Sequence, residues 1–223
     1  MTDGKGPGDS GGAPSLPVIP DDHVWRRGED WLLMHPIAPG WELAVGAYSV
    51  RRRKSLDRIV GDQDTREALL SVPLRPDRIC AVVMEGAVVG CLSYRMDGAG
   101  SLRPQFARYR ARFGLVGGAL RYGMTLATLY RGRSKDLYIE GFAVAPETRG
   151  RGLGKALLEW LSAEVLRHGK AGWRTEMPEG HEAAARAYQR FGAREERRVW
   201  LGPVGRLLGS RYMTLWRWTP PET

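Results

Sequence analysis

Apolar runs along the chain predict a series of short β-strands with helices between them. Residues 78–84 and 87–96 are β-branched apolar runs separated by a two-residue Glu-Gly turn, which is typical of a β-hairpin. Residues 136–144 (DLYIEGFAV) form the next expected strand, which Pro146 ends because proline cannot continue a central ladder. Further strands are expected at residues 30–35, 172–177, 196–201 and 211–218.

Two segments in the second half of the chain carry clear helix signals. Apolar positions three and four residues apart mark residues 152–167 as an amphipathic helix. Residues 182–191 are alanine-rich and are followed by Gly192, a good helix C-cap. The expected order from residue 136 onward is therefore strand, helix, strand, helix and two final strands.

Two other regions have mixed helical spacing. Residues 41–72 are mostly helical and are expected to form two helices. The dividing positions are Gly46, Gly61 and Asp62. Residues 104–132 are predicted to form a helical insertion, whose apolar part has about the length of a membrane span. Arg121 and four glycines disfavour a span, so we expect a buried or interface-covering helix and no membrane partner.

The composition of the 223-residue chain, 43% hydrophobic and 26% charged, is that of an ordinary globular protein. Residues 1–22 are rich in Gly, Pro and Ser, so we expect a disordered leader followed by a single domain at residues 23–223. The leader has no apolar stretch for a signal peptidase or a bilayer, which makes the cytoplasm the expected location. Cys80 and Cys91 lie in apolar runs and are expected to be reduced core residues.

The formal net charge of +9 favours anionic partners, which could be nucleic acid, a membrane surface or a phosphorylated cofactor. The basic run at residues 51–54 is the candidate for nucleic acid, but no recognition motif with interleaved aromatic residues accompanies it. We interpret the run as a solvated helix face and expect no nucleic-acid partner. His23, His35 and His168 form no spaced cluster with the cysteines, so we expect no metal site.

A Gly-rich turn joins the strand at residues 136–144 to the helix that follows. Unpaired backbone N–H groups and the helix dipole attract an anion at such a place, and alternate glycines let the backbone approach it closely. A phosphate group is the natural ligand. The residues of the turn are Arg149, Gly150, Arg151, Gly152, Leu153, Gly154 and Lys155.

The spacing within the turn excludes two familiar phosphate sites. A Walker A loop needs glycine where Arg149 stands and serine or threonine where Ala156 stands. A G-x-G-x-x-G dinucleotide fingerprint fails because the third glycine arrives one residue early, at Gly154. P-loop and NAD-binding functions are therefore disfavoured.

The remaining pattern, Arg-x-x-Gly-x-Gly at Arg149, Gly152 and Gly154, follows the apolar strand end and resembles the acyl-CoA-binding signature of the GNAT superfamily of N-acetyltransferases. The order of elements over about residues 78–218 is similar to the GNAT core. The resemblance implies an α/β (α+β) fold with a mixed, mostly antiparallel twisted sheet of about six to seven strands flanked by helices. The leader and the insertion at 104–132 depart from a minimal member.

The resemblance also implies roles for particular residues, with acetyl-CoA (coenzyme A) as the cofactor. The amides of the turn would hold the pyrophosphate. Phe142 and Ala143 would lie along the pantetheine arm, and the N–H of Val144 would face the thioester carbonyl. Two positions differ from the family pattern: His181 replaces an asparagine, and Ala187 replaces an aromatic residue.

Acetyl transfer to an amine needs a base, because an alkyl ammonium with a pKa near 10.4 is only about 0.1% neutral at neutral pH. Glu140, on the strand before the turn, lies where family members often place a carboxylate for this purpose, and a salt-bridged strand carboxylate is the alternative. Glu176 is the second choice. Tyr188 matches the family tyrosine that protonates the leaving thiolate, with a buried structural tyrosine as the alternative.

These interpretations lead to one preferred function and two alternatives. The preferred function is an enzyme that transfers acetyl from acetyl-CoA to a primary amine of a small molecule, peptide or protein. The first alternative is a non-catalytic acyl-CoA-binding sensor or interaction module, and the second is a basic nucleic-acid-binding protein. An exposed helical insertion is also compatible with a homodimer.

Overall fold

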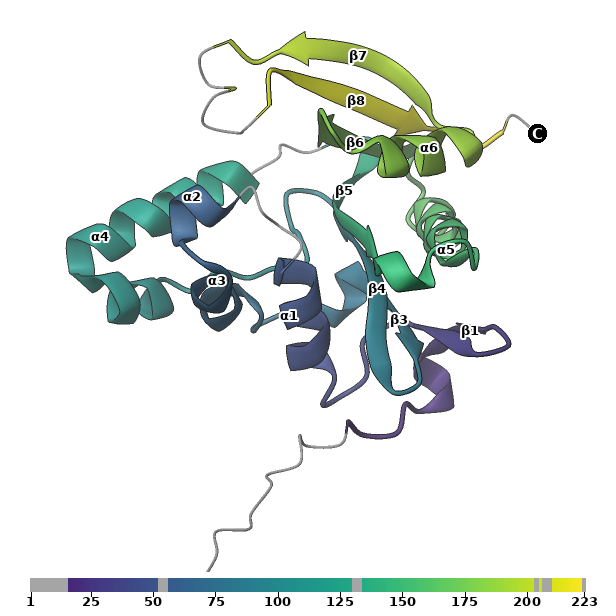
Figure 1. Cartoon of the computed structure of the whole chain (residues 1–223), viewed down its shortest axis with the longest axis horizontal. Helices are drawn as coiled ribbons and strands as arrows, with labels where there is room; N and C mark the ends of the chain where they lie inside the picture. Colours follow the sequence, from purple (N-terminus) through teal and green to yellow (C-terminus); the bar gives the residue numbers. More distant parts are fainter. Residues whose placement is uncertain (1–15, 52–55, 130–133, 203–204, 206–209, 222–223) are drawn as a thin grey trace, which may run out of the picture.

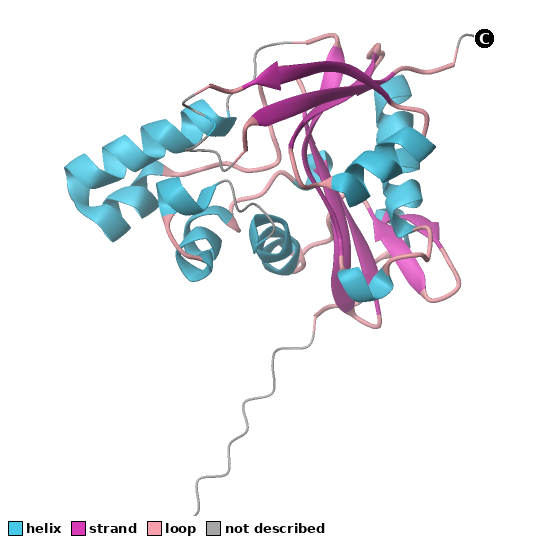
Figure 2. Cartoon of the chain, turned by 45° about the horizontal axis from the view of Figure 1, so that its top comes forward, coloured by secondary structure: helices cyan, strands magenta, loops and turns pink. Residues whose placement is uncertain are grey.

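The protein forms an open, twisted sheet with helices on both faces (Figures 1 and 2). The computed structural model describes residues 16–51, 56–129, 134–202, 205 and 210–221. Within these residues the sheet has eight strands in the order β1-β2-β3-β4-β5-β6-β8-β7, and only β5 and β6 pair in parallel. The strands are β1 (Val24–Arg27), β2 (Trp31–Met34), β3 (Ile79–Met84), β4 (Ala87–Arg95), β5 (Asp136–Val144), β6 (Gly172–Pro178), β7 (Arg194–Trp200) and β8 (Tyr212–Trp218).

The architecture confirms the expected mixed, mostly antiparallel sheet flanked by helices. Each of the seven strands expected from the sequence is present, and β1 is an additional one at the edge. β1 is four residues long with the sequence VWRR, which is too short to show the alternation of a strand. It forms because β2 offers it a partner, so its presence depends on pairing rather than on its own sequence.

The helices divide between the two faces of the sheet, and each face has its own core. α5 and α6 cover one face, whereas α1 to α4 lie on the other (Figure 1). Cys80 belongs to the first core and Cys91 to the second, and both are free buried thiols, as expected. The helices are α1 (Glu42–Arg51), α2 (Asp57–Val60), α3 (Gln63–Leu70), α4 (Phe106–Leu129), α5 (Leu153–Arg167) and α6 (Glu182–Arg190), with 3-10 turns η1 (Asp21–His23), η3 (Pro76–Arg78) and η4 (Pro146–Thr148).

The region expected to contain two helices contains three, α1 to α3. Gly61, with a φ of 118°, follows α2, and the side chain of Asp62 caps α3 by accepting from the Thr65 N–H at 2.9 Å. The helix breaks expected at Gly61 and Asp62 are therefore confirmed. Gly46 does not divide a helix, because it lies inside α1 where a Cβ atom would collide with the Ser71 carbonyl oxygen. Close packing, not a chain break, requires glycine there.

The insertion is helical, as expected, but α4 bends at Gly114, whose φ of 73° is not helical. Its apolar side chains are largely exposed, so of the two expected forms, a buried or an interface-covering helix, the exposure argues against the buried one. Among the described residues, no helix is both long enough and apolar enough to cross a membrane.

The segment expected to be a disordered leader is partly folded. Residues 1–15 lie outside the described residues, but residues 16–22 are placed against the domain. Ile19 packs on the core beside α1, and the Trp41 side chain donates to the Pro17 carbonyl oxygen at 2.9 Å. The end of the expected leader is therefore part of the domain. Of the basic run at 51–54, only Arg51 is described, and it pairs with Glu67 at 3.0 Å.

Candidate functional site

The central feature of the candidate site is the divergence of β5 from β6. These parallel strands pair only where Asp136–Tyr138 lie beside Gly172–Arg174. Beyond that point β6 continues along β8, while β5 continues along β4. Among the described strands, no partner covers this edge of β5 from Ile139 to Val144. Its backbone polar groups are therefore free to bind an extended ligand.

The Gly-rich turn follows the unpaired part of β5 and forms the start of α5. Gly150 and Gly152 have positive φ values of 84° and 76°, which glycine adopts at little cost. Gly152 is the N-cap of α5 and provides no side-chain cap. Within the described residues, the first backbone bond of the helix is from the Ala156 N–H to the Gly152 oxygen, and the N–H groups of residues 150–155 have no backbone acceptor. The turn thus offers N–H groups that can donate to an anion.

The side chains around the turn make it open and cationic. A Cβ atom on Gly150 or Gly152 would meet nothing within 4 Å, so a ligand can reach the backbone. Arg151 pairs with Asp30, and Lys155 lies 3.6 Å from Glu159. Arg149 is exposed and has no ion pair among the described residues. The first turn of α5 contains no acidic residue that would oppose an anion.

Phe142 connects the free edge of β5 to both helices of that face. Its ring lies 5.4 Å from the Tyr188 ring, and its tip faces the Cα of Gly154, where a Cβ atom would come within 3.3 Å. Val144 packs on the same core, and Ala143 lies on the opposite side of the strand by alternation. The three residues expected to contact a cofactor thus form one continuous stretch that leads into the turn.

Tyr188 lies at the point where β5 and β6 separate. It is buried on α6, and its hydroxyl forms a hydrogen bond with that of Thr175 on β6. Its ring also lies 5.6 Å from the Trp173 ring. Burial raises the pKa of Tyr188 well above its ordinary value, so the hydroxyl keeps its proton at neutral pH. The position suits both a proton donor and a structural tyrosine.

Glu140 lies on the opposite face of β5, next to the irregular pairing of β5 with β4. One carboxylate oxygen pairs with Arg95. The other accepts from the Ser101 N–H at 2.7 Å and from the Ser101 hydroxyl at 2.9 Å. The side chain is only 3% exposed, so this carboxylate holds the loop before α4 against the sheet. No pattern in the sequence reveals Arg95 and Ser101 as its partners.

Glu176 and His181 both lie at exposed positions, on β6 and directly before α6. Glu176 is exposed on β6 and, because its neighbours Thr175 and Met177 face the α6 side, it faces the same side of the sheet as Glu140. His181 is the exposed residue before α6 and makes no side-chain capping bond.

A cavity of about 610 Å³ lies on the face that carries α4, and its wall includes Arg95, the ion-pair partner of Glu140. Its walls are mainly apolar and come from the loop before α4 and from the last turns of α4, while two arginines add positive charge. The principal lining residues are Arg75, Arg95, Leu102, Pro104, Leu126 and Leu129. Sequence reasoning missed this cavity because its walls are brought together from segments far apart in the chain.

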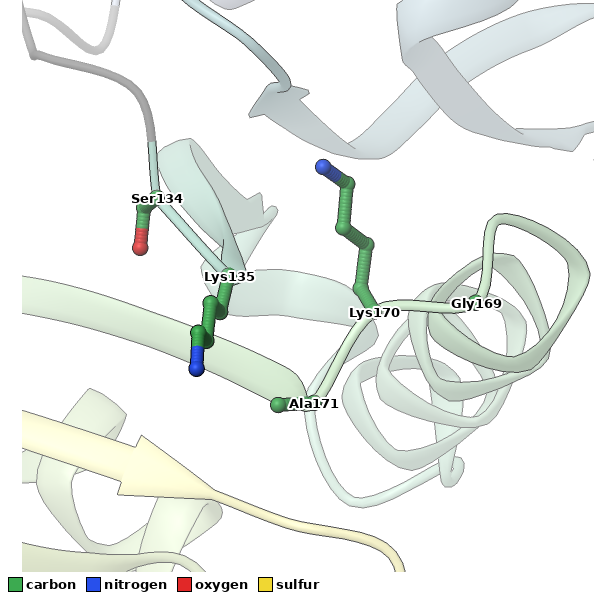
Figure 3. Close-up of a pocket in the computed structure, with 5 residues that line it drawn as sticks. All are labelled: Ser134, Lys135, Gly169, Lys170 and Ala171. Atoms are coloured by element: carbon green, nitrogen blue, oxygen red, sulfur yellow. The ribbon is translucent and has the colours of Figure 1, made fainter.

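A second hollow, of about 540 Å³, lies at the other end of β5 (Figure 3). It is lined by Ser134, Lys135, Gly169, Lys170 and Ala171. These residues precede β5 and β6, whereas the Gly-rich turn follows β5. Lys170 is bound to Asp97 at 2.9 Å. The hollow is therefore separate from the candidate site.

A family model described as the acetyltransferase (GNAT) family matches residues 47–193, more than half of the chain. The chain belongs to the GNAT acetyltransferase family. The match includes β5, the Gly-rich turn, α5 and α6, so the GNAT assignment covers all the elements that form the candidate site. A search of curated proteins finds no match.

Solved GNAT structures share the fold at low sequence identity. An apo form of a mutant agmatine N-acetyltransferase has a TM-score of 0.56 at 14% identity, covering 86% of this chain and 100% of that chain. The ribosomal-protein-S5-alanine acetyltransferase from Vibrio fischeri has a TM-score of 0.53 at 11% identity, covering 88% and 97%. Ard1 from Thermoplasma volcanium has a TM-score of 0.50 at 14% identity, covering 86% and 99%. At these identities the likeness concerns the GNAT fold.

Proposed function

We propose that this protein is an N-acetyltransferase that moves the acetyl group of acetyl-CoA to a primary amine of a small molecule, peptide or protein by direct attack. One observation carries the proposal: the free edge of β5 leads directly into a turn whose N–H groups have no backbone acceptor among the described residues. This arrangement suits a ligand with an extended arm and a pyrophosphate. Family membership supports the choice of acetyl-CoA.

In this proposal the cofactor follows the polypeptide from the turn to the strand. The pyrophosphate accepts from the N–H groups of residues 150–155, and Arg149 adds charge. The pantetheine arm lies along Phe142 and Ala143 on the free edge of β5. The N–H of Val144 is directed to the thioester carbonyl and stabilises the oxyanion. No metal is assigned to the reaction.

The chemical step moves one acetyl group from sulfur to nitrogen. It needs a base that deprotonates the amine and an acid that protonates the leaving thiolate. Glu140 takes a proton from the ammonium form of the acceptor, with Glu176 as the alternative base on the same face. The neutral amine forms the new C–N bond, and the C–S bond of the thioester breaks. The tetrahedral intermediate loses its second N–H proton to water, and Tyr188 protonates the thiolate of coenzyme A. Water then returns a proton to the Tyr188 phenolate, so the products are the amide, the free thiol and the one proton held by Glu140. The two proton-transfer groups lie on opposite sides of β5, so each can act on a different substrate.

The acceptor is proposed to enter from the cavity beside Glu140. Its apolar walls suit an amine with an apolar body. Arg75 and Arg95 line it, and Arg95 is already neutralised by Glu140, so Arg75 is left as the positive group. This charge favours acceptors that also carry a carboxylate over polyamines.

The test is release of free thiol from acetyl-CoA across a panel of amines, together with the melting temperature in the presence of coenzyme A. We expect coenzyme A to raise the melting temperature by mass action and at least one amine to accelerate thiol release. A shift without turnover for any amine supports the non-catalytic binding module instead. Absence of the shift overturns the proposal.

A matched pair of variants localises the cofactor. Gly152 and Gly169 both have positive φ values, 76° and 59°, and open space where a Cβ atom would lie. Gly152→Ala and Gly169→Ala therefore introduce similar backbone strain. The shift caused by coenzyme A should fall only for Gly152→Ala, because only that methyl group enters the proposed pyrophosphate site. Equal shifts in the two variants contradict this placement.

A further inference from the structure

The second half of α4 presents an apolar face to solvent. Leu115, Val116 and Leu120 are 65%, 82% and 65% exposed, and Met124 and Leu126 are 39% and 41% exposed. Val116, Leu120 and Met124 recur every four residues, and Leu115 and Leu126 lie beside them on the same half of the helix surface. We call these five residues the α4 apolar face. Soluble monomers rarely leave a patch of this kind uncovered.

This exposure is not a result of a poorly docked helix, because the other side of α4 is fixed to the protein. Gly118 is buried, and a Cβ atom there would approach the Tyr109 carbonyl oxygen to 2.8 Å. The Tyr109 hydroxyl donates to Thr125 at 3.1 Å, which joins the two halves of α4 across the bend. Arg121 donates to the Ile59 carbonyl oxygen of α2 at 2.6 Å. The polar contacts thus face inward, and the apolar face is directed outward.

The position of α4 leaves this face accessible. In Figure 1 the helix lies at the end of the molecule away from α5, beyond α2 and α3. Its last turn lines the cavity beside Glu140 through Leu126 and Leu129, but Leu115, Val116 and Leu120 are not among the lining residues. The outer part of the face therefore has a role separate from that cavity.

The charge around the apolar face indicates what it binds. From Gly98 to Lys135 the sequence has eight arginines and lysines and no aspartate or glutamate. Arg110 and Arg112, on the first half of α4, are exposed, and Arg112 stacks on Phe113 at 5.7 Å. Arg108 and Arg121 donate to the Ala68 and Ile59 carbonyl oxygens, so the exposed cations placed on α4 are Arg110 and Arg112. An apolar helix face on such a cationic segment matches a surface that offers both phosphate and hydrocarbon.

We infer that the α4 apolar face docks on membrane surfaces rich in anionic phospholipid. Leu115, Val116 and Leu120 enter the boundary between headgroups and acyl chains, and the neighbouring arginines contact lipid phosphates. The helix lies in the plane of the interface, since it is not long and apolar enough to span the bilayer. Membrane docking departs from the sequence-based expectation of no membrane partner, and it does so because these side chains are exposed.

The test uses the full chain and sedimentation with vesicles of phosphatidylcholine alone or mixed with phosphatidylglycerol. We expect binding to the mixed vesicles, little binding to phosphatidylcholine alone, and weaker binding as salt is raised. Because the whole protein carries a net charge of +9, attraction to anionic vesicles alone does not locate the contact. A pair of variants with the same change in charge, one on α4 and one elsewhere, locates the contact.

Leu120 on α4 and Leu166 on α5 are both 65% exposed, so Leu120→Glu and Leu166→Glu change the net charge equally at similarly solvated positions. Leu120→Glu should weaken binding to anionic vesicles at least about tenfold, whereas Leu166→Glu should weaken it only slightly. Melting temperatures of both variants show whether the fold is retained. Equal effects of the two changes, or no binding of the wild type at low salt, overturn the inference.

The same variants distinguish other occupants of the face. A concentration-dependent dimer in analytical ultracentrifugation that Leu120→Glu dissociates, without vesicle binding, assigns the face to a second copy and rejects the lipid. Vesicle binding that is insensitive to Leu120→Glu and is matched in strength by an acidic polypeptide shows attraction by charge alone and also rejects the lipid.

Discussion

The rings of Phe142 and Tyr188 lie 5.4 Å apart and join the free edge of β5 to the helix that follows β6. Tyr188 also contacts Thr175 on β6, so it is bound to both of the strands that separate. The ring contact holds the place where β5 and β6 separate, on the face of the sheet that carries α5 and α6. It is also where a thiolate would leave in the proposed reaction.

Replacement of Tyr188 by phenylalanine tests its proposed role as proton donor. The change removes one hydroxyl and keeps the ring contacts, so the fold should lose only about 1 kcal/mol with the bond to Thr175. We expect kcat to fall by about 10²-fold while the thermal shift caused by coenzyme A persists. Steady-state kinetics beside thermal melts provide the measurement. An unchanged kcat makes Tyr188 a structural residue.

Glu140→Gln should affect both stability and turnover. Loss of the carboxylate leaves Arg95 buried without its counter-charge, which costs about 3–5 kcal/mol. Glu176→Gln, on an exposed side chain, should change stability by less than about 0.5 kcal/mol. Denaturant unfolding measures both effects.

A double variant separates the structural and catalytic roles of Glu140. Arg95→Met combined with Glu140→Gln removes both buried charges and should recover much of the lost stability. If Glu140 is the base, this stable variant keeps a strongly reduced kcat/KM, and its residual activity lacks the acid limb of the wild-type pH profile. Recovered activity in the double variant would assign the base to another group, with Glu176→Gln as the next test.

Two glycines in helices should respond to alanine in opposite directions. Gly46→Ala drives a methyl group into the Ser71 carbonyl oxygen and should destabilise the fold by about 1–3 kcal/mol. Gly123→Ala, in α4, meets nothing within 4 Å and should stabilise by about 0.5–1 kcal/mol. Chemical denaturation of the two variants tests this. A Gly46→Ala variant that is as stable as the wild type, or more stable, contradicts the packing described for α1.

Stability should fall as the pH drops below neutrality because of His35. Burial lowers the pKa of His35 in the folded protein, although Glu164 and Asp77 oppose the change and Arg167 adds to it. The unfolded chain therefore binds a proton first, near the ordinary value of 6.5, and each step down in pH favours unfolding until the folded pKa is passed.

The measurement for His35 is the melting temperature from pH 7.5 to pH 5. His35→Gln retains a donor for the Ile79 carbonyl oxygen and should reduce the decline over this range. His181→Gln, on an exposed position, is the control and should leave the decline unchanged. Glu164 adds a further loss at lower pH: burial raises the pKa of its carboxyl group, but bonds from Arg167 and Tyr94 outweigh this and lower it. A decline that is the same in wild type and His35→Gln rejects the assignment.

Local signals in the sequence determined the hairpin of β3 and β4, the Gly-rich turn and the helix α5. A two-residue turn, alternate glycines and a helical period each act over a few residues, so they can be read without knowledge of distant contacts. The same signals led to the GNAT resemblance, which the family match confirms. The roles assigned to Glu140 and Tyr188 stay predictions.

Only the tertiary structure decided how those elements meet. Glu140 and Ser101 are 39 residues apart, and no periodicity links them. The hydrogen bond between the Ser101 hydroxyl and the Glu140 carboxylate could therefore not be predicted from the sequence. β1 exists because β2 pairs with it. The apolar residues of α4 are visible in the sequence, but their exposure depends on which side of the helix the rest of the protein covers. Pairing and burial are properties of the whole fold, because they require segments that are distant in sequence to come into contact.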